Sequence, residues 1–330
     1  MGCINDAFNR PINYLRVSVT DRCNLRCVYC MPTDGVQLMP HEDILRYEEI
    51  ERIVRAASSL GLSKVRLTGG EPLVRAGIVG LVHALANVPG IDDLAMTTNG
   101  ILLAQQARAL AAAGLRRVNV SLDTLRPERF ARLCRVGRLE QVLEGIEAAQ
   151  AEGLAPVKLN TVVVRGLNDD EVAEIARTTL ERDWHVRFIE LMPMVQSGDW
   201  EADGYVPASE IKARVETVGP LTPAAGPARP GDGPARYYRL PGARGTVGFI
   251  TPVSEHFCFQ CNRLRLTADG KLRPCLLRAD EIDLRAALRA GADEAKMADL
   301  IARAVRLKPE GHELARRQAP TGRTMSQIGG

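Results

Sequence analysis

The chain has 330 residues, of which 45% are hydrophobic, and this is enough apolar material for a large core and for a barrel-sized domain with an extension. Its 43 Lys and Arg residues nearly balance its 40 Asp and Glu residues, so the net charge of +3 gives no reason to infer a nucleic-acid partner. The first residues lack a basic segment followed by an apolar one, and no run of about 18 apolar residues occurs. The sequence therefore predicts a cytoplasmic protein without a membrane partner.

Short β-rich runs alternate with helical patterns from Tyr14 to about Pro193, and this alternation favours parallel βα units. Six strands are predicted, at residues 14–19, 64–68, 93–98, 117–122, 157–164 and 185–191. A helix is predicted over 46–61, and three helical runs are followed by a residue suited to a left-handed cap, namely Gly61, Gly114 and Gly153. Six units fit either a doubly wound sheet or an incomplete barrel, and chain length does not choose between them.

Residues 220–234 are rich in Pro, Gly and Ala, which is typical of a linker. We therefore expect three parts: a βα part over 1–219, a linker over 220–236 and a C-terminal part over 237–330. In the last part, RYYRLPGARGTVGFITPV and RLRLTADGKLRPCLL predict two β-hairpins, the second of which turns at Asp269-Gly270. Two helical runs follow, from Asp280 and from Asp293.

Three cysteines, Cys23, Cys27 and Cys30, come directly after the first predicted strand. Thiolates hold iron–sulfur clusters, and three of them on one short loop leave one iron of a cube open to bind a small molecule. Structural zinc is the alternative, but structural zinc sites are coordinated by four protein ligands, and this loop provides three. The eight cysteines are clustered at two places, which in a cytosolic chain favours reduced metal ligands over disulfides.

Polar residues also follow the other predicted strands, in the stretches Gly69-Gly70-Glu71, Thr97-Thr98-Asn99, Ser121-Leu122-Asp123 and Met192-Pro193. In parallel α/β folds the loops after the strands meet at one face, where ligands bind. The glycine pair either lets the backbone approach a ligand closely or makes a tight turn. We expect a binding site on this face, together with the cysteine loop.

A second cysteine group consists of Cys258, Cys261 and Cys275, and again there are three thiols. His256 lies close enough in sequence to complete a zinc site, so zinc stays open as an interpretation here. The remaining cysteines, Cys3 and Cys134, are interpreted as ordinary thiols.

Arg263 and Arg265 would point to the same side of a strand, where paired guanidinium groups suit phosphate oxygens, although solvated arginines are equally expected in such an Arg-rich chain. Only six of the 43 basic residues are lysines, and Lys64 and Lys158 lie beside or inside predicted strands. The terminal Gly329-Gly330 is either frayed or a backbone finger that can enter a narrow site.

With these residues assembled, the sequence resembles the molybdenum-cofactor biosynthesis protein A family, the GTP 3′,8-cyclases of the radical S-adenosylmethionine (SAM) superfamily. The blocks that carry the resemblance run nearly end to end: TDRCNLRCVYCMP, RLTGGEPL, TTNG, SLDTL, KLNTVVVRGLNDDE, RFIELMPM, HFCFQCNRLRLTADGKLRPCLL, KPEGH and the terminal IGG. The resemblance implies an α/β fold, an incomplete six-unit (βα) TIM-like barrel with a C-terminal α+β extension. It also implies two [4Fe–4S] clusters, one on each cysteine group, and SAM as cofactor.

By the same resemblance, SAM would contact Tyr29, Gly70, Glu71, Ser121 and Met192. GTP would contact Arg16, Arg66, Thr97, Lys158, Arg263 and Arg265, and Lys64 and Arg187 are further candidates. Arg263, Arg265, Gly329 and Gly330 would assist catalysis.

The implied reaction starts with reductive cleavage of SAM, and the resulting 5′-deoxyadenosyl radical takes hydrogen from ribose C3′ of GTP. Bond formation to C8 then gives (8S)-3′,8-cyclo-7,8-dihydroguanosine 5′-triphosphate. An electron donor and a downstream cyclic pyranopterin monophosphate synthase would be functional partners, and a homodimer is implied by the resemblance alone. The alternatives are a peptide-modifying radical SAM enzyme with an auxiliary cluster and a zinc-containing regulatory or nucleic-acid-binding protein.

Overall fold

One twelve-stranded sheet runs through the computed structural model, which describes residues 2–32, 35–192, 204–225, 233–312 and 323–329. Its centre is formed by the six predicted strands, which pair in chain order and in parallel. They are β1 (Tyr14–Ser18), β2 (Lys64–Thr68), β3 (Asp93–Thr98), β4 (Arg117–Ser121), β5 (Lys158–Val163) and β6 (His185–Glu190). The strand predictions are thus confirmed.

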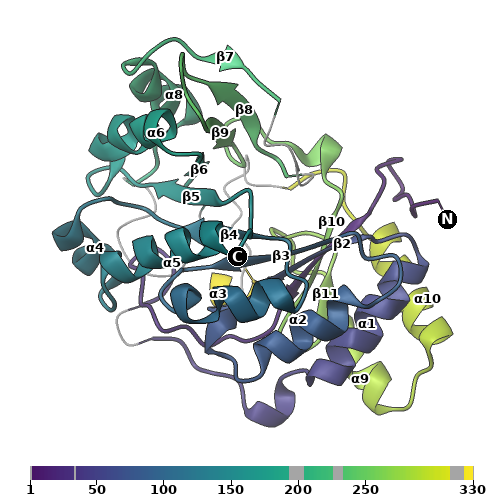
Figure 1. Ribbon diagram of the computed structural model, residues 1–330. Coiled ribbons are helices and arrows are strands. Elements are labelled where there is room, and N and C mark those ends of the chain that lie inside the picture. Colours follow the sequence, from purple (N-terminus) through teal and green to yellow (C-terminus); the bar gives the residue numbers. More distant parts are fainter. Residues whose placement is uncertain (1, 33–34, 193–203, 226–232, 313–322, 330) are drawn as a thin grey trace.

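Strands from the C-terminal part extend both edges of this central sheet. β9 (Thr246–Ile250) pairs in parallel with β6, and β10 (Arg263–Leu266) pairs in parallel with β1. These two strands follow one another in the chain but stand at opposite edges of the parallel sheet, so residues 251–262 cross the open side between them. The result is an incomplete barrel that the C-terminal extension covers (Figure 1).

Both predicted hairpins are present. β8 (Arg236–Arg239) is antiparallel to β9, and β11 (Lys271–Arg273) is antiparallel to β10 across the Asp269-Gly270 turn. The sheet ends at β7 (Thr222–Pro223) on one side and at β12 (Ile282–Asp283) on the other. Residues 226–232 of the predicted linker lie outside the described residues, and the division at 219 and 237 stays a prediction.

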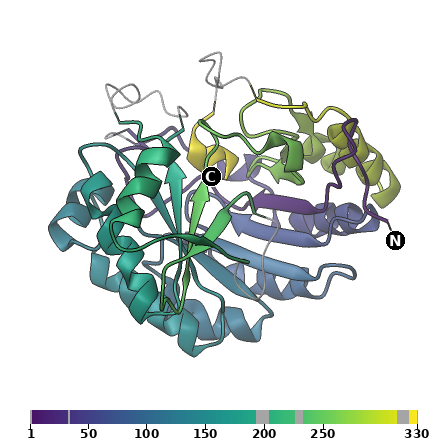
Figure 2. The ribbon, with the colours of Figure 1, turned by 90° about the horizontal axis from the view of Figure 1, so that it is seen from above.

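Helices cover the outer face of the sheet (Figures 1 and 2). Those that follow the central strands are α1 (Tyr47–Ser59), α2 (Ile78–Ala86), α3 (Leu103–Ala112), α4 (Pro127–Cys134), α5 (Leu139–Ala151) and α6 (Val172–Glu181). Further along the chain lie α8 (Ala208–Glu216), α9 (Leu284–Arg289), α10 (Glu294–Arg306) and α11 (Met325–Ile328). Short 3-10 turns occupy His41–Asp43, Pro72–Val74, Asp169–Glu171 and Cys258–Gln260.

The predicted glycine caps have the left-handed backbone that such caps need, with φ of 86° at Gly61, 99° at Gly114 and 73° at Gly153. Between strands and helices lies one large apolar core, to which Leu15 and Val17 of β1 contribute. Arg16 stands between these two residues and points to the other face, because successive side chains of a strand alternate. The barrel interior is therefore polar, while the space under the helices is apolar.

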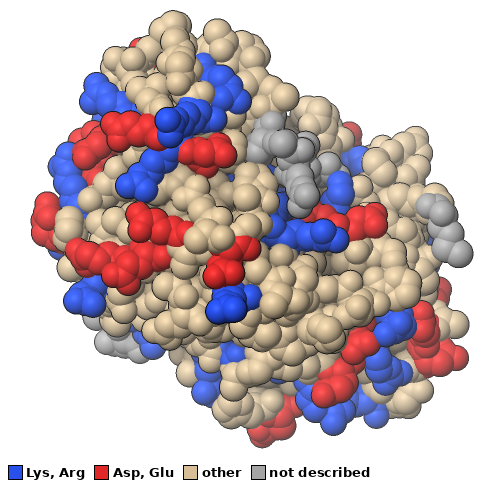
Figure 3. All heavy atoms as spheres, viewed as in Figure 1, with Lys and Arg blue, Asp and Glu red and all other residues tan. Residues whose placement is uncertain are grey.

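No helix in the described part of the chain has the length and apolar character needed to cross a bilayer. On the face shown in Figure 3, basic and acidic side chains are interspersed, as expected from the small net charge.

Candidate functional site

The first cysteine group lies on the loop after β1, which is joined by backbone hydrogen bonds to the loop after β2. The Gly70 N–H donates to the Thr20 carbonyl at 2.8 Å, and the Glu71 N–H donates to the Arg22 carbonyl at 2.8 Å. A Cβ atom on Gly70 would stand 2.3 Å from the Arg22 carbonyl oxygen. The glycine pair therefore allows the second loop to pack against the backbone that leads into Cys23.

Cys23, Cys27 and Cys30 all line one cavity at the carboxyl ends of the parallel strands. The Leu25 N–H donates to the Cys23 sulfur at 3.4 Å, and the Asn99 side-chain amide approaches the same sulfur at 3.8 Å. Burial raises the pKa of Cys23 to about 11, and a hydrogen bond with Cys134 together with burial raises that of Cys27. Three thiols on one loop, with backbone donors to sulfur, fit an iron–sulfur cluster held at three irons.

The residues expected to contact SAM gather around this loop, since Tyr29, Gly70, Glu71, Ser121 and Met192 all line the cavity. The Tyr29 hydroxyl donates to the Asp123 carboxylate, which also accepts from the Val162 N–H at 2.8 Å. Tyr29 thus belongs to a hydrogen-bond network that joins the first cysteine loop to Asp123, after β4, and to Val162 of β5.

Glu71 organises the loops after β2 and β3. Its Oε1 accepts from the Thr98 hydroxyl at 2.7 Å and its Oε2 accepts from the Asn99 N–H at 2.6 Å. Burial nevertheless raises the pKa of the Glu71 carboxyl to about 7. The carboxyl group is held in place by protein donors, and the loop that carries Asn99 is fixed beside Cys23.

The second cysteine group faces the same cavity from the C-terminal extension. Cys258 begins the 3-10 turn between β9 and β10, Cys261 follows that turn, and Cys275 follows β11. The Leu277 N–H donates to the Cys275 sulfur at 3.5 Å, and the His312 N–H donates to the Cys258 sulfur. This donor set also fits an iron–sulfur cluster.

The two cysteine groups have different electrostatic surroundings. Burial raises the pKa of Cys261, but Arg263 and Lys308 outweigh this effect and lower the pKa to about 6. Around Cys23 the nearby charge is that of Glu71, which raises the pKa further. His256, the residue considered as a fourth zinc ligand, packs its ring edge-on against His312 with centroids 5.6 Å apart.

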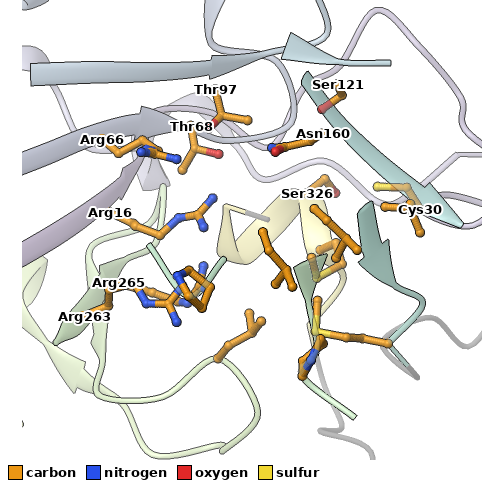
Figure 4. A pocket seen from close by; sticks show the side chains of 18 of the residues that line it. Arg16, Cys30, Arg66, Thr68, Thr97, Ser121, Asn160, Arg263, Arg265 and Ser326 are labelled. Carbon is orange, nitrogen blue, oxygen red and sulfur yellow. The ribbon is translucent and has the colours of Figure 1, made fainter. Parts of the chain in front are cut away.

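Arginines form one wall of the cavity: Arg16, Arg66, Arg187, Arg263 and Arg265. Figure 4 shows four of them, Arg16, Arg66, Arg263 and Arg265, together on one side, whereas Cys30 and Ser121 lie on the other. Burial lowers the pKa of Arg66 and of Arg265 to about 10. Such a crowded wall of cations is suited to a polyanion.

Several buried polar atoms of this cavity have no hydrogen-bond partner among the described residues: Arg66 Nε, Thr97 Oγ1, Asn160 Oδ1 and Arg187 Nε and Nη2. Buried polar atoms are usually paired, so these atoms are available for hydrogen bonds with a polar ligand or with water in the cavity. Asn160 was not singled out from the sequence, because nothing in VKLNTVVV distinguishes it before the strand is placed.

Lys158 is not part of the cavity lining. It lies deeper in the barrel, with 1% of its surface exposed, and Arg66 and Arg187 are among the cations that influence it. Lys64, at the first position of β2, does not line the cavity either.

The C-terminal residues enter the barrel mouth. Arg265 donates to the Gly329 carbonyl at 3.2 Å, and a Cβ atom on Gly329 would stand 2.8 Å from Thr68 Cγ2. Met325 and Ser326 of α11 line the cavity. Gly330 and Pro193 lie outside the described residues, and the expected role of the tail stays a prediction.

Comparisons with known proteins match the chain in two adjacent pieces. Residues 17–179 match the radical SAM superfamily, and residues 184–314 match the family described as Molybdenum Cofactor Synthesis C. The GTP 3′,8-cyclase of Pelotomaculum thermopropionicum is 58% identical over 99% of this chain and 100% of its own length. That of Moorella thermoacetica is 55% identical over 99% of this chain and its full length.

Among solved structures, Streptococcus suis SuiB bound to S-adenosylmethionine is similar with a TM-score of 0.59 and 15% sequence identity. The similarity covers 80% of this chain and 60% of that one, and it shows the fold alone. The open parallel barrel and the two cysteine groups on one cavity are thus those of a radical SAM protein. Within that superfamily, the chain belongs to the family of GTP 3′,8-cyclases.

Proposed function

We propose that this protein is an enzyme that cyclises GTP to (8S)-3′,8-cyclo-7,8-dihydroguanosine 5′-triphosphate, the first step of molybdenum cofactor biosynthesis. The observation that supports this function best is the single cavity lined by both cysteine groups and by the arginine wall. A site for radical generation and a site for a polyanion are then adjacent, as the reaction requires.

Cys23, Cys27 and Cys30 would hold the first [4Fe–4S] cluster, and SAM would lie among Tyr29, Gly70, Glu71, Ser121 and Met192. When bound, this cluster and SAM supply the 5′-deoxyadenosyl radical that takes hydrogen from ribose C3′. The protein's own contribution is to fix this loop: Gly70 packs on it, Glu71 anchors the neighbouring loop, and Asp123 orients the Tyr29 hydroxyl.

Cys258, Cys261 and Cys275 would hold a second [4Fe–4S] cluster, on the side of the cavity where GTP would lie. Arg16, Arg66, Thr97, Arg263 and Arg265 would bind GTP, with Lys158 below them. The triphosphate carries about four negative charges. Several cations in the site are needed to compensate for the hydration that these charges lose on binding. The unpartnered Arg187 atoms support adding this residue to the set, whereas Lys64 has no such support.

The tail completes the assignment. Arg265, which we assign to GTP binding, donates a hydrogen bond to the carbonyl of Gly329 in the tail. The tail is therefore in direct contact with the proposed GTP site. We propose that Gly329 and Gly330 reach the substrate from the barrel mouth, because at Gly329 only a residue without a side chain fits between Ser18 and Thr68. A reducing partner, a downstream cyclic pyranopterin monophosphate synthase and a homodimer remain further proposals.

The test is metal analysis followed by isotope transfer. Protein purified without oxygen should contain about eight irons and as much sulfide, for two cubes of four. After reduction with SAM and GTP deuterated at C3′, the label should appear in 5′-deoxyadenosine. Zinc without sulfide, or label that arises only from another substrate, would contradict the proposal.

Arg263→Ala and Arg265→Ala test the arginine wall. Each should weaken GTP binding at least tenfold while SAM cleavage without GTP changes little, because both side chains lie on the wall opposite Cys30. Arg108→Ala, which removes an exposed arginine of α3, is the matched control. Equal loss of GTP binding and SAM cleavage in the two variants would count against a triphosphate role.

A further inference from the structure

We infer that Lys308 is a positioning residue for the second cysteine group: its ammonium group holds Cys261 in place and supplies the positive charge beside a cluster on Cys258, Cys261 and Cys275. The inference rests on the proposed function, because it requires the second cluster. It assigns a role to a residue of the KPEGH stretch that sequence analysis left without one.

Lys308 lies just beyond α10, with 3% of its surface exposed, and it lines the cavity. Its Nζ donates to the Arg263 carbonyl at 2.8 Å and to the Pro274 carbonyl at 2.7 Å, and it also hydrogen-bonds the Cys261 sulfur. These three acceptors use all three protons of an ammonium group. A buried lysine with no carboxylate among these three partners is costly unless a negative group faces it, and here that group is the Cys261 sulfur.

The acceptors are placed so that one side chain fixes two of the three ligands. Arg263 follows Cys261 by two residues at the start of β10, and Pro274 directly precedes Cys275 after β11. Lys308 therefore ties together the two ends of the β10–β11 hairpin from which Cys261 and Cys275 project.

The segment that carries Lys308 also contacts the third ligand. The His312 N–H donates to the Cys258 sulfur, and a Cβ on Gly311 would lie 3.9 Å from that sulfur. The segment is itself held by Arg10, which is 5% exposed. The Arg10 guanidinium donates to the carbonyls of Pro309 at 2.6 Å, of Glu310 at 2.8 Å and of Cys258 at 2.7 Å.

The charge of Lys308 has a predictable effect on such a cluster. Thiolate ligands make a cluster negative, and one-electron reduction makes it more negative still. A cation in hydrogen-bond contact with a ligand sulfur therefore stabilises the reduced form and raises the reduction potential. If Lys308 served only to satisfy backbone carbonyls, its removal would change stability and leave the potential unchanged.

The experiment isolates the second cluster in the full chain with Cys23, Cys27 and Cys30 all changed to Ala. In this parent, Lys308→Met keeps the length of the side chain and removes its charge, Lys308→Arg keeps the charge, and Lys296→Met on the exposed face of α10 is the control. We expect Lys308→Met to shift the midpoint potential to more negative values, so that the reduced fraction at a fixed applied potential falls several-fold. Lys308→Arg should stay near the parent, and Lys296→Met should equal it.

A measurement on the unaltered lysine covers the case in which Lys308→Met does not fold. Parent protein grown with lysine labelled with ¹⁵N at Nζ should show ¹⁵N hyperfine coupling to the reduced cluster without GTP, and Lys308→Arg should lack it. Absence of the coupling, or an unchanged potential in Lys308→Met, overturns the inference while leaving the proposed function intact. A parent without about four irons overturns both, because there is then no second cluster.

Discussion

Lys158 lies beneath the arginine wall, where burial together with Arg187 and Arg117 lowers the pKa of its ammonium group to about 6. A lysine with a depressed pKa is mostly neutral at pH 8. A triphosphate bound above Lys158 favours the charged ammonium group and therefore raises its pKa. At any pH between the pKa values of Lys158 without and with triphosphate, the side chain takes up a proton when the triphosphate binds.

We therefore predict that GTP binding at pH 8 is coupled to uptake of up to about one proton by the protein. Isothermal titration in buffers of different ionisation enthalpy measures this number directly, and GTP itself is fully ionised at this pH. Lys158→Arg is the matched variant, since a guanidinium stays charged in both states and the uptake should disappear. Equal uptake in the two proteins would show that Lys158 does not respond to the ligand.

At the scale of single residues, sequence was informative where spacing alone defines a site. Spacing put each cysteine group on one short stretch and Arg263 and Arg265 on one side of a strand, and all of them line the cavity, but their assignment to clusters and to GTP came from the resemblance. The depth of Lys158 in the barrel could not be predicted. The alternation of side chains along a strand predicts on which face of the sheet a residue lies, but not how far it lies from the barrel mouth. Lys308 could not be assigned either, since its contacts with Cys261 and Pro274 exist only in the folded chain.

At the scale of elements, the loop after β2 gives a steric test. Gly70→Ala would bring a Cβ to 2.3 Å from the Arg22 carbonyl oxygen, a backbone atom that cannot rotate away. We expect a loss of about 1–3 kcal/mol in unfolding free energy and reduced iron at the first cysteine group. Thermal unfolding and iron analysis measure the two effects.

Gly80→Ala in α2 is the matched control for this change. Apart from its two chain neighbours and the backbone of its own helix, no atom of the described residues lies within 4 Å of the position its Cβ would take. Alanine should therefore leave iron content unchanged and stabilise the helix by up to about 1 kcal/mol. If Gly70→Ala behaved like Gly80→Ala, the packing of the two loops would not be what holds the first cysteine group.

The element that ends in the tail is held by a doubled ion pair. Arg323, just before α11, contacts Asp269 of the β10–β11 turn at 2.9 Å and Glu281 at 2.7 Å. We predict that Arg323→Met releases the tail, lowers isotope transfer from GTP at least several-fold and leaves SAM cleavage without GTP nearly unchanged. Arg108→Met is the control, and limited proteolysis should cut the released tail faster. Unchanged isotope transfer with faster proteolysis would mean that the tail does not assist catalysis.

Sequence predicted the central strands and both hairpins well, because alternation and turn residues are local signals. What it did not reveal is that the two hairpins pair with the edges of the central sheet, β10 with β1 and β9 with β6. Tyr14 pairs with Arg263 and His185 pairs with Thr246, and such long-range pairing depends on the closing geometry of the whole sheet. The placement of the second cysteine group opposite the first follows from these two pairings.

At the scale of the whole molecule, the continuous sheet and the shared core predict cooperative unfolding. One apolar cluster contains both Ile12 near the start and Val305 near the end. Hydrogen exchange in urea should therefore give the same opening free energy for β3 and for β10. Two separated transitions that divide within 220–236 would instead favour independently stable parts.

The order of the strands along the chain also sets an order of events during synthesis. β1 to β6 leave the ribosome first and can pair with one another, whereas β10, the second cysteine group and the tail are made last. Before β10 is synthesised, the edge of the sheet at β1 has no partner strand. The first cysteine loop is then accessible to the proteins that deliver iron and sulfide. Arg16, Arg66 and Arg187 of the arginine wall are present at this stage, whereas Arg263, Arg265 and the second cysteine group are added only afterwards. A nascent chain can therefore receive a cluster at Cys23, Cys27 and Cys30 before the cavity in which radical chemistry could begin is complete.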